Sequence, residues 1–161
     1  MQKKEEILAT LKTSLKEGDE QKVSVLRFLL SCIQNKEKAK RQKLAEAGED
    51  DLETKSQLSD EEIIEIISSE IKKAKEALSQ FEQGERNDLI EKTKKEIEIL
   101  SSFLPERLTR EELEKLVKAA IEEIGAQTQK DMGKVMSILM PKVKGRADGK
   151  EVAEIVKELL S

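Results

Sequence analysis

The sequence predicts an all-α protein, with a bundle of long antiparallel helices followed by a small three-helix part. Apolar residues return every three or four positions through most of the 161 residues. No segment alternates apolar and polar residues as a half-buried strand does. Apolar residues make up 37% of the chain, charged residues 40%, and the only aromatic residues are three Phe. We therefore expect an aliphatic core and helices with broad solvated faces.

The first two helices are expected over Gln2–Glu17 and from Glu20 to about Ala47. Gly18 suits the position after a helix end, where a left-handed backbone is common. Asp19 can accept hydrogen bonds from the first turn of the second helix. These two residues indicate where the first helix ends and the second begins.

The second helix changes character along its length. Its first half, VSVLRFLLSCI, is apolar nearly all round, as a central buried helix is. Within it, we expect Arg27 to reach the surface or to pair with an acid, and the lone Cys32 to be a buried, inert thiol. The second half contains a second basic patch, for which a solvated helix extension is the favoured interpretation because acidic residues follow. Its basic residues are Lys36, Lys38, Lys40, Arg41 and Lys43.

Residues Gly48–Leu58 are polar, acidic and without periodicity, which predicts a mobile loop. Ser59 opens a third helix with Glu62 at the capping-box position, and Gly84 ends it. Asn87 or Asp88 is expected to cap a fourth helix, and the short connection predicts antiparallel packing of the two. The apolar stripe of the third helix is Ile63, Ile67, Ile71, Ala74, Leu78 and Phe81, and that of the fourth is Ile90, Ile97 and Leu100.

A boundary between two subdomains is expected around Pro105–Leu108, because proline interrupts the helical pattern there. It divides the chain into residues 1–104 and residues 105–161. Thr109 and Glu112 then form a capping box for a fifth helix. The apolar residues of that helix are Leu113, Leu116, Val117, Ala120, Ile121 and Ile124.

The segment Asp131–Leu160 predicts two short amphipathic helices around a glycine-flanked basic loop. Pro141 is expected to break the first of them or to kink its last turn. Asp148, with Glu151 three residues on, suggests a variant capping box for the second. The apolar positions of the two helices are Met132, Val135, Met136, Leu139, Met140, Val152, Ile155, Val156, Leu159 and Leu160.

Positive charge is concentrated around this loop. The chain has a net charge of −4, whereas residues 130–150 contain six basic and two acidic residues. Nucleic acid could therefore bind only through a local patch, where lysines contact phosphates and glycines let a backbone approach closely. The candidate RNA-binding residues are Lys134, Lys142, Lys144, Gly145, Arg146, Gly149 and Lys150. A loop whose charges only keep it solvated is the alternative.

The segment DMGKVMSILMPKVKGRADGKEVAEIVKELL resembles the closing motif of the YqeY-like family. The similarity extends upstream through FLPERLTREELEKLVKAAIEEIGA and covers essentially the whole chain. The family in turn resembles the tail domain of the B subunit of the tRNA-dependent amidotransferase, a tail implicated in contacting tRNA. The resemblance implies a bacterial, cytoplasmic tRNA-binding protein whose loop cations contact RNA backbone, with an amidotransferase or other translation-related proteins as further partners. It also implies glutamine-dependent amide transfer.

The chain lacks the residues that such a reaction would need on its own. Histidine is absent, which removes the commonest general base and metal ligand. Residues 145–151 fail as a phosphate-binding P-loop, since three residues separate the glycines and Glu151 follows the lysine. We therefore expect no catalytic residue, no metal and no cofactor, and no apolar run long enough to span a membrane.

A protein-interaction adaptor or accessory subunit without RNA binding is the alternative function. It would use the N-terminal helices or the methionine face formed by Met132, Met136 and Met140, since methionine adapts to varied surfaces. Packing of these methionines in the core is the favoured interpretation, because three short helices need every apolar side chain they have.

Overall fold

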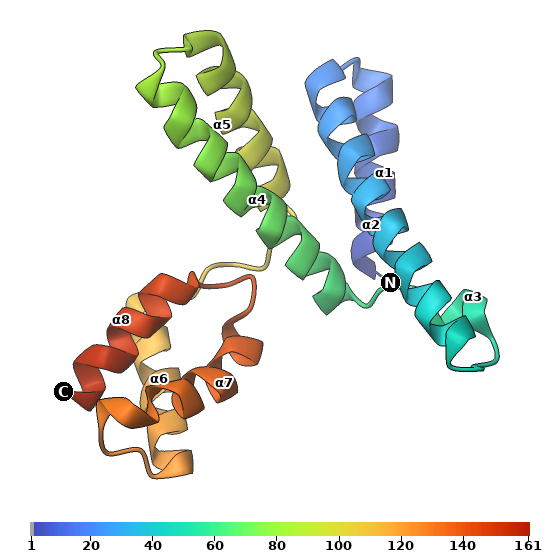
Figure 1. Cartoon of the computed structure of the whole chain (residues 1–161). Coiled ribbons are helices and arrows are strands. Elements are labelled where there is room, and N and C mark those ends of the chain that lie inside the picture. The colour runs from blue at the N-terminus through green and yellow to red at the C-terminus, as the bar shows by residue number, and fades with distance from the viewer. Residues whose placement is uncertain (1) are drawn as a thin grey trace. The chain divides into compact units, whose positions relative to one another are not determined.

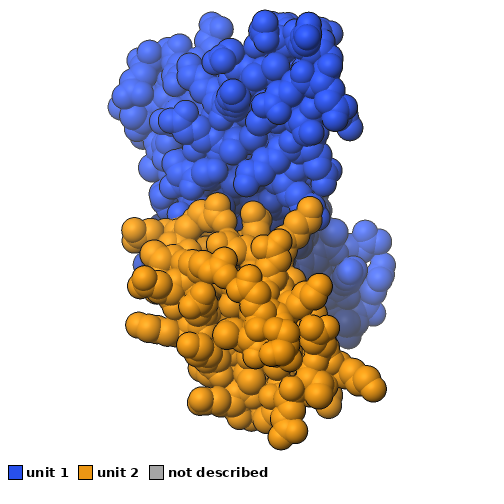
Figure 2. All heavy atoms as spheres, turned by 90° about the vertical axis from the view of Figure 1, so that its left-hand side faces the viewer, with its two compact units in different colours: residues 1–104 blue, residues 105–161 orange. Residues whose placement is uncertain are grey.

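The computed structural model describes residues 2–161, which form eight α-helices and one short 3-10 helix (Figure 1). No strand occurs among these residues, so the all-α prediction is confirmed. The chain divides into two compact units, residues 1–104 and 105–161 (Figure 2). The helices are α1 (Gln2–Glu17), α2 (Glu20–Glu46), α3 (Leu52–Lys55), α4 (Asp60–Gln83), α5 (Asn87–Ser101), α6 (Arg110–Ile124), η1 (Gln129–Asp131), α7 (Met132–Val143) and α8 (Gly149–Leu160).

Two helical hairpins build the first unit. Helix α1 packs on α2, and α4 packs along α5, the second pair as expected from its short connection (Figure 1). Gly18 takes a left-handed backbone with φ of 72°, which lets the chain reverse between α1 and α2. Buried aliphatic side chains from α1, α2, α4 and α5 form one core. Its fully buried members include Ile7, Leu26, Leu29, Ile33, Leu58, Ile63, Ile67 and Leu100.

Local hydrogen bonds explain where the helices of this unit begin. The predicted capping box of α4 is present, because the Glu62 carboxylate accepts from the Ser59 backbone N–H at 2.8 Å and Ser59 Oγ accepts from Glu62 N–H at 3.2 Å. The expected cap of α5 is wrong. Its N-cap residue is Arg86, whose carbonyl accepts from Ile90 N–H at 2.9 Å and whose side chain makes no capping bond.

The expected loop at Gly48–Leu58 is structured over its second part. Helix α3 occupies Leu52–Lys55, and the side chain of Leu58 is only 2% exposed within the first core. The carboxylate of Glu37 accepts a bond from Leu58 N–H at 3.4 Å. Because the segment is polar on average, the sequence did not predict that one of its leucines is buried and anchors the end of the loop in the core.

The second basic patch, on the second half of α2, is partly neutralised by acids of α4. Lys40 Nζ lies 3.0 Å from a Glu62 carboxylate oxygen, and Lys36 Nζ lies 3.5 Å from Glu65. Earlier on the same helix, Arg27 is exposed, as expected. Cys32 is only partly buried, yet burial and the nearby Glu70 carboxylate raise the pKa of its thiol, which disfavours the reactive thiolate.

Helices α6, α7 and α8 pack against one another in the second unit around a second aliphatic core. Pro141 does not break α7, which runs on to the fully buried Val143. The three methionines of the methionine face are partly buried against this core, which confirms their structural role. The core residues are Leu113, Val117, Ala120, Val135, Leu139, Val143, Val152, Ile155, Val156 and Leu160.

A partly buried carboxylate pair in the first unit yields a prediction. Burial raises the pKa of Glu96 on α5, and the like charge of Glu70 on α4 raises it further. A raised pKa in the folded state means that stability falls as pH rises above the ordinary glutamate range. We expect Glu96→Gln to raise the midpoint of thermal unfolding at pH 7, with a smaller difference at pH 4.

The matched control is Glu91→Gln, an exposed glutamate on the same helix, for which we expect no such change. Thermal unfolding followed by circular dichroism at both pH values measures the effect. A lower unfolding midpoint for Glu96→Gln at pH 7 would contradict the prediction.

Candidate nucleic-acid interface

The predicted RNA-binding residues do not all lie together. Lys142 stands in the last turn of α7, residues 144–148 connect α7 to α8, and Gly149 and Lys150 open α8. Lys134 stands near the start of α7, eight residues before Lys142, which places it about 12 Å away along the helix axis. The basic turn is therefore defined as residues 142–150, and Lys134 lies outside it.

Main-chain hydrogen bonds hold the basic turn in one conformation. Gly145 adopts φ of 74°, a left-handed value that other residues rarely take. Arg146 N–H donates to Val143 O at 2.9 Å, and Arg146 O accepts from Leu108 N–H at 2.9 Å. The Arg146 guanidinium Nε donates to the Glu106 carbonyl at 3.0 Å. Arg146 therefore braces the turn against the segment that precedes α6 and is only half-exposed.

Arg107 is a residue of this region that the sequence analysis missed. One of its terminal guanidinium nitrogens lies 3.2 Å from a Glu151 carboxylate oxygen and 3.9 Å from Asp148 Oδ2. The capping box expected from Asp148 and Glu151 does not form, because Glu151 turns to Arg107 and Asp148 makes no side-chain capping bond. Arg107 also offsets the carboxylate charge that would otherwise oppose an anion at the turn.

Exposed lysines supply the remaining charge of the basic turn. Lys144 and Lys150 are both exposed, and Lys150 makes no ion pair with any residue that the structure describes. Lys142 Nζ lies 3.7 Å from a Glu123 carboxylate oxygen of α6, which weakens its attraction for another anion. Over the second unit the charges balance, with eleven basic and eleven acidic residues in 105–161. Any attraction for phosphate is therefore local.

Neither a metal site nor a membrane span is found in the described part of the chain. Within residues 2–161, no group of three or more Cys, Asp or Glu side chains could hold a metal ion. No helix among them is long and apolar enough to cross a membrane.

The N-terminal caps of α6 and α8 differ, and we expect them to contribute differently to stability. Thr109 Oγ1 accepts from Glu112 N–H at 3.2 Å, whereas Asp148 caps nothing with its side chain. We expect Thr109→Ala to lower the free energy of unfolding by about 1 kcal/mol. Asp148→Ala should cost less than about 0.5 kcal/mol, because it removes only an exposed contact to Arg107. Urea unfolding measures both, and equal losses would contradict the assignment of the caps.

The conformation of the basic turn yields a second prediction. Gly145→Ala places a side chain at φ of 74° and should lower the free energy of unfolding by about 1 kcal/mol. Gly149→Ala is the matched control, since its new Cβ would meet only Met140 Cε, at an ordinary contact distance of 3.7 Å. We expect this control to leave stability unchanged or to raise it, because alanine favours a helix. A stable Gly145→Ala variant would refute a strained turn.

Comparison with known proteins shows a family match over most of the chain. Residues 4–160 match the family model described as Yqey-like protein. The chain is 29% identical over 104 residues to the "Altered inheritance of mitochondria protein 41, mitochondrial" of Pyrenophora tritici-repentis, covering 63% of this chain and 57% of that protein. It is 43% identical over 47 residues to an uncharacterized protein of Schizosaccharomyces pombe, covering 29% of this chain and 38% of that protein.

Both of these relatives are fungal, and the chain spans about half of their length or less. Their names mention neither RNA nor amide transfer, so these parts of the resemblance, like the bacterial source, stay predictions. The family match itself runs over nearly all of the chain and includes both helical units. The chain belongs to the YqeY-like family.

Proposed function

We propose that the second unit binds the phosphate backbone of structured RNA through the basic turn, and that tRNA is the RNA class concerned. The anchored conformation of residues 142–150 supports this most directly. A turn that the hydrogen bonds of Arg146 already hold loses little conformational entropy when it binds a ligand. The choice of tRNA comes from the likeness between YqeY-like proteins and the amidotransferase tail.

Lys144 and Lys150 are the main phosphate-contacting residues in this proposal. Both are exposed, and they flank the left-handed Gly145, where the backbone can come close to a ligand. Lys142 contributes after its contact with Glu123 is exchanged for a phosphate. Arg146 acts through the shape of the turn, and Lys134 takes part only if the RNA extends along α7.

The mode of recognition is shape and charge. The second unit contains no aromatic residue that could stack on a base. Contacts to phosphate and sugar position a protein on RNA without reading its sequence. Binding that is sensitive to salt and insensitive to sequence is the expected result.

The cellular role that fits this binding is that of an accessory protein in translation. Amidotransferase subunits are the proposed protein partners, and the chain would hold or deliver tRNA while another subunit performs the amide transfer. The cytoplasm is the proposed location, although the name of one fungal relative places that protein in mitochondria.

The direct test is fluorescence anisotropy of labelled total tRNA with wild-type protein and the Lys144→Glu/Lys150→Glu variant. We expect wild-type binding in the micromolar range that weakens as salt is raised. The variant should bind at least about tenfold more weakly and show a salt slope smaller by about two, since each lysine contributes about one phosphate contact.

The matched control is Lys115→Glu/Lys118→Glu, two exposed lysines of α6 that face away from the buried Leu113 and Val117. It makes the same change in net charge at a different place. Equal losses in both variants would show general electrostatic attraction and refute a site at the basic turn. Absence of tRNA binding by wild-type protein would refute the proposed function.

A further inference from the structure

Two leucine side chains of α1 are exposed to solvent, although this helix packs on α2. The side chain of Leu8 is 47% exposed and that of Leu15 is 51% exposed. They are seven residues apart, which places them on one side of α1 and about 10 Å apart along its axis. Leu11 between them is partly buried against the first core. An apolar edge thus runs along the α1–α2 hairpin and remains uncovered by the described part of the chain.

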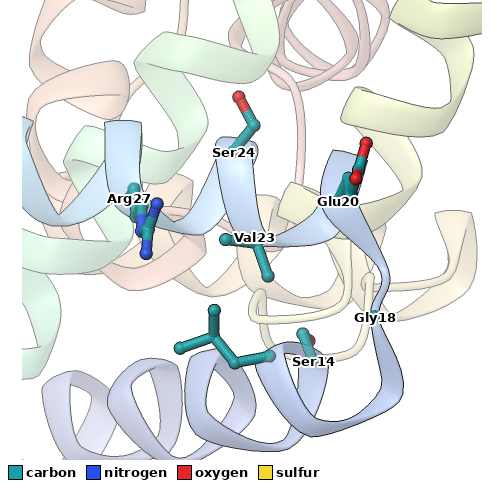
Figure 3. A pocket seen from close by; sticks show the side chains of 7 residues that line it. Ser14, Gly18, Glu20, Val23, Ser24 and Arg27 are labelled. Carbon is teal, nitrogen blue, oxygen red and sulfur yellow. The ribbon is translucent and has the colours of Figure 1, made fainter.

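A hollow continues this edge between the two helices, close to their connecting turn (Figure 3). It has a volume of about 390 Å³, and Leu15 and Val23 give it apolar walls. Figure 3 shows Val23 and Arg27 on the side of α2 that faces α1. The groove is defined as this hollow together with Leu8 and Leu15. A hollow between two helices, with exposed leucines beside it, suits the ridge of side chains on a third helix.

Two unpaired cations lie beside the groove, together with two acids, Glu5 on α1 and Glu20 on α2. Lys12 and Arg27 are exposed and have no ion pair or hydrogen bond from their side chains to any described residue. In contrast, Lys4 of the same helix is paired, with Nζ 2.8 Å from Glu37. Lys12 follows Leu8 by four residues and precedes Leu15 by three, so it shares their side of α1. Glu20 lines the hollow two turns before Arg27 and is the one acid there.

We propose that the groove binds one amphipathic helix of a partner protein. Leucine-like side chains of that helix pack on Leu8 and Leu15, and its carboxylates face Lys12 and Arg27. The binding mode is a helix laid into a hydrophobic groove, where residues one or two turns apart act as anchors. Charge complementarity to Lys12 and Arg27 selects a helix with carboxylates at the matching positions, whereas Glu20 disfavours a carboxylate at the end near the turn. This protein-binding site lies in the first unit and is independent of the RNA-binding site proposed in the second.

A pair of designed peptides tests the groove. Each has about five helical turns with leucines on one face; one has glutamates along the flanks and the other has lysines at the same positions. We expect the acidic peptide to bind full-length protein at micromolar concentration by fluorescence anisotropy and the basic peptide to bind at least about tenfold more weakly. Leu8→Ser and Leu15→Ser should each weaken the acidic peptide about tenfold.

Phe28→Ser is the matched control. Phe28 is 53% exposed on α2, as Leu8 and Leu15 are on α1, but it is not among the residues that line the hollow. We expect this variant to keep wild-type affinity. The charge-swapped Lys12→Glu/Arg27→Glu variant should prefer the basic peptide, which would identify the two cations as the source of specificity.

Three outcomes would overturn the proposal. The first is no saturable binding of the acidic peptide, and the second is binding that both leucine variants retain. The third is that wild-type protein ignores the peptides but sediments with vesicles of phosphatidylcholine and phosphatidylserine, and that the leucine variants do not. That result would make the exposed leucines a lipid-facing surface. Because Leu8 and Leu15 are exposed, their variants should keep the far-UV circular dichroism spectrum of the wild type.

Discussion

Burial of aliphatic side chains in two separate cores is the constraint on which the rest of the structure depends. The chain has no Trp or Tyr, so each unit must gain its stability from many small side chains. Helices as short as α7 and α8 are not stable alone in water. The fully buried Val143 and Val152 hold the two ends of the basic turn in the second core. The conformation of that turn, on which the proposed phosphate binding relies, thus depends on apolar packing a few residues away.

Features governed by neighbours along the chain could be predicted from the sequence. The capping box of Ser59 and Glu62 needs only residues three positions apart, and it formed as expected. The pattern of Asp148 and Glu151 is nearly the same, yet no capping box forms there, and the Glu151 carboxylate contacts Arg107 instead. Sequence spacing identifies the local partner of a side chain but not a distant one. Leu58 lies in the connection before α4, as expected, but its burial could not be predicted for the same reason, since it depends on contacts with other helices.

The candidate site shows the same limit. Seven residues were predicted together because they are close in sequence or share a basic character, but only those of the basic turn meet in space. Arg146 carries the positive charge that a phosphate ligand needs. Its side chain instead supports the turn, because Nε donates a hydrogen bond to the Glu106 carbonyl at 3.0 Å. Gly149 was expected to shape the loop, but it begins α8 and needs no left-handed backbone. Hydrogen bonds that the sequence does not reveal distinguish a cation that supports the turn, such as Arg146, from one that is free to contact a ligand.

The two proposed surfaces rely on different forces, and this lets one small chain carry both. The basic turn attracts phosphate by charge in a unit whose own charges balance, so its affinity must fall as salt screens the lysines. The groove of the first unit gains most of its affinity by removing Leu8 and Leu15 from water, which salt does not weaken, while Lys12 and Arg27 decide which helix is accepted. The first unit as a whole has 19 basic and 23 acidic residues, so its net charge does not favour a polyanion. In the two proposals together, an acidic partner helix makes that charge more negative and leaves the basic turn as the favoured place for RNA phosphates.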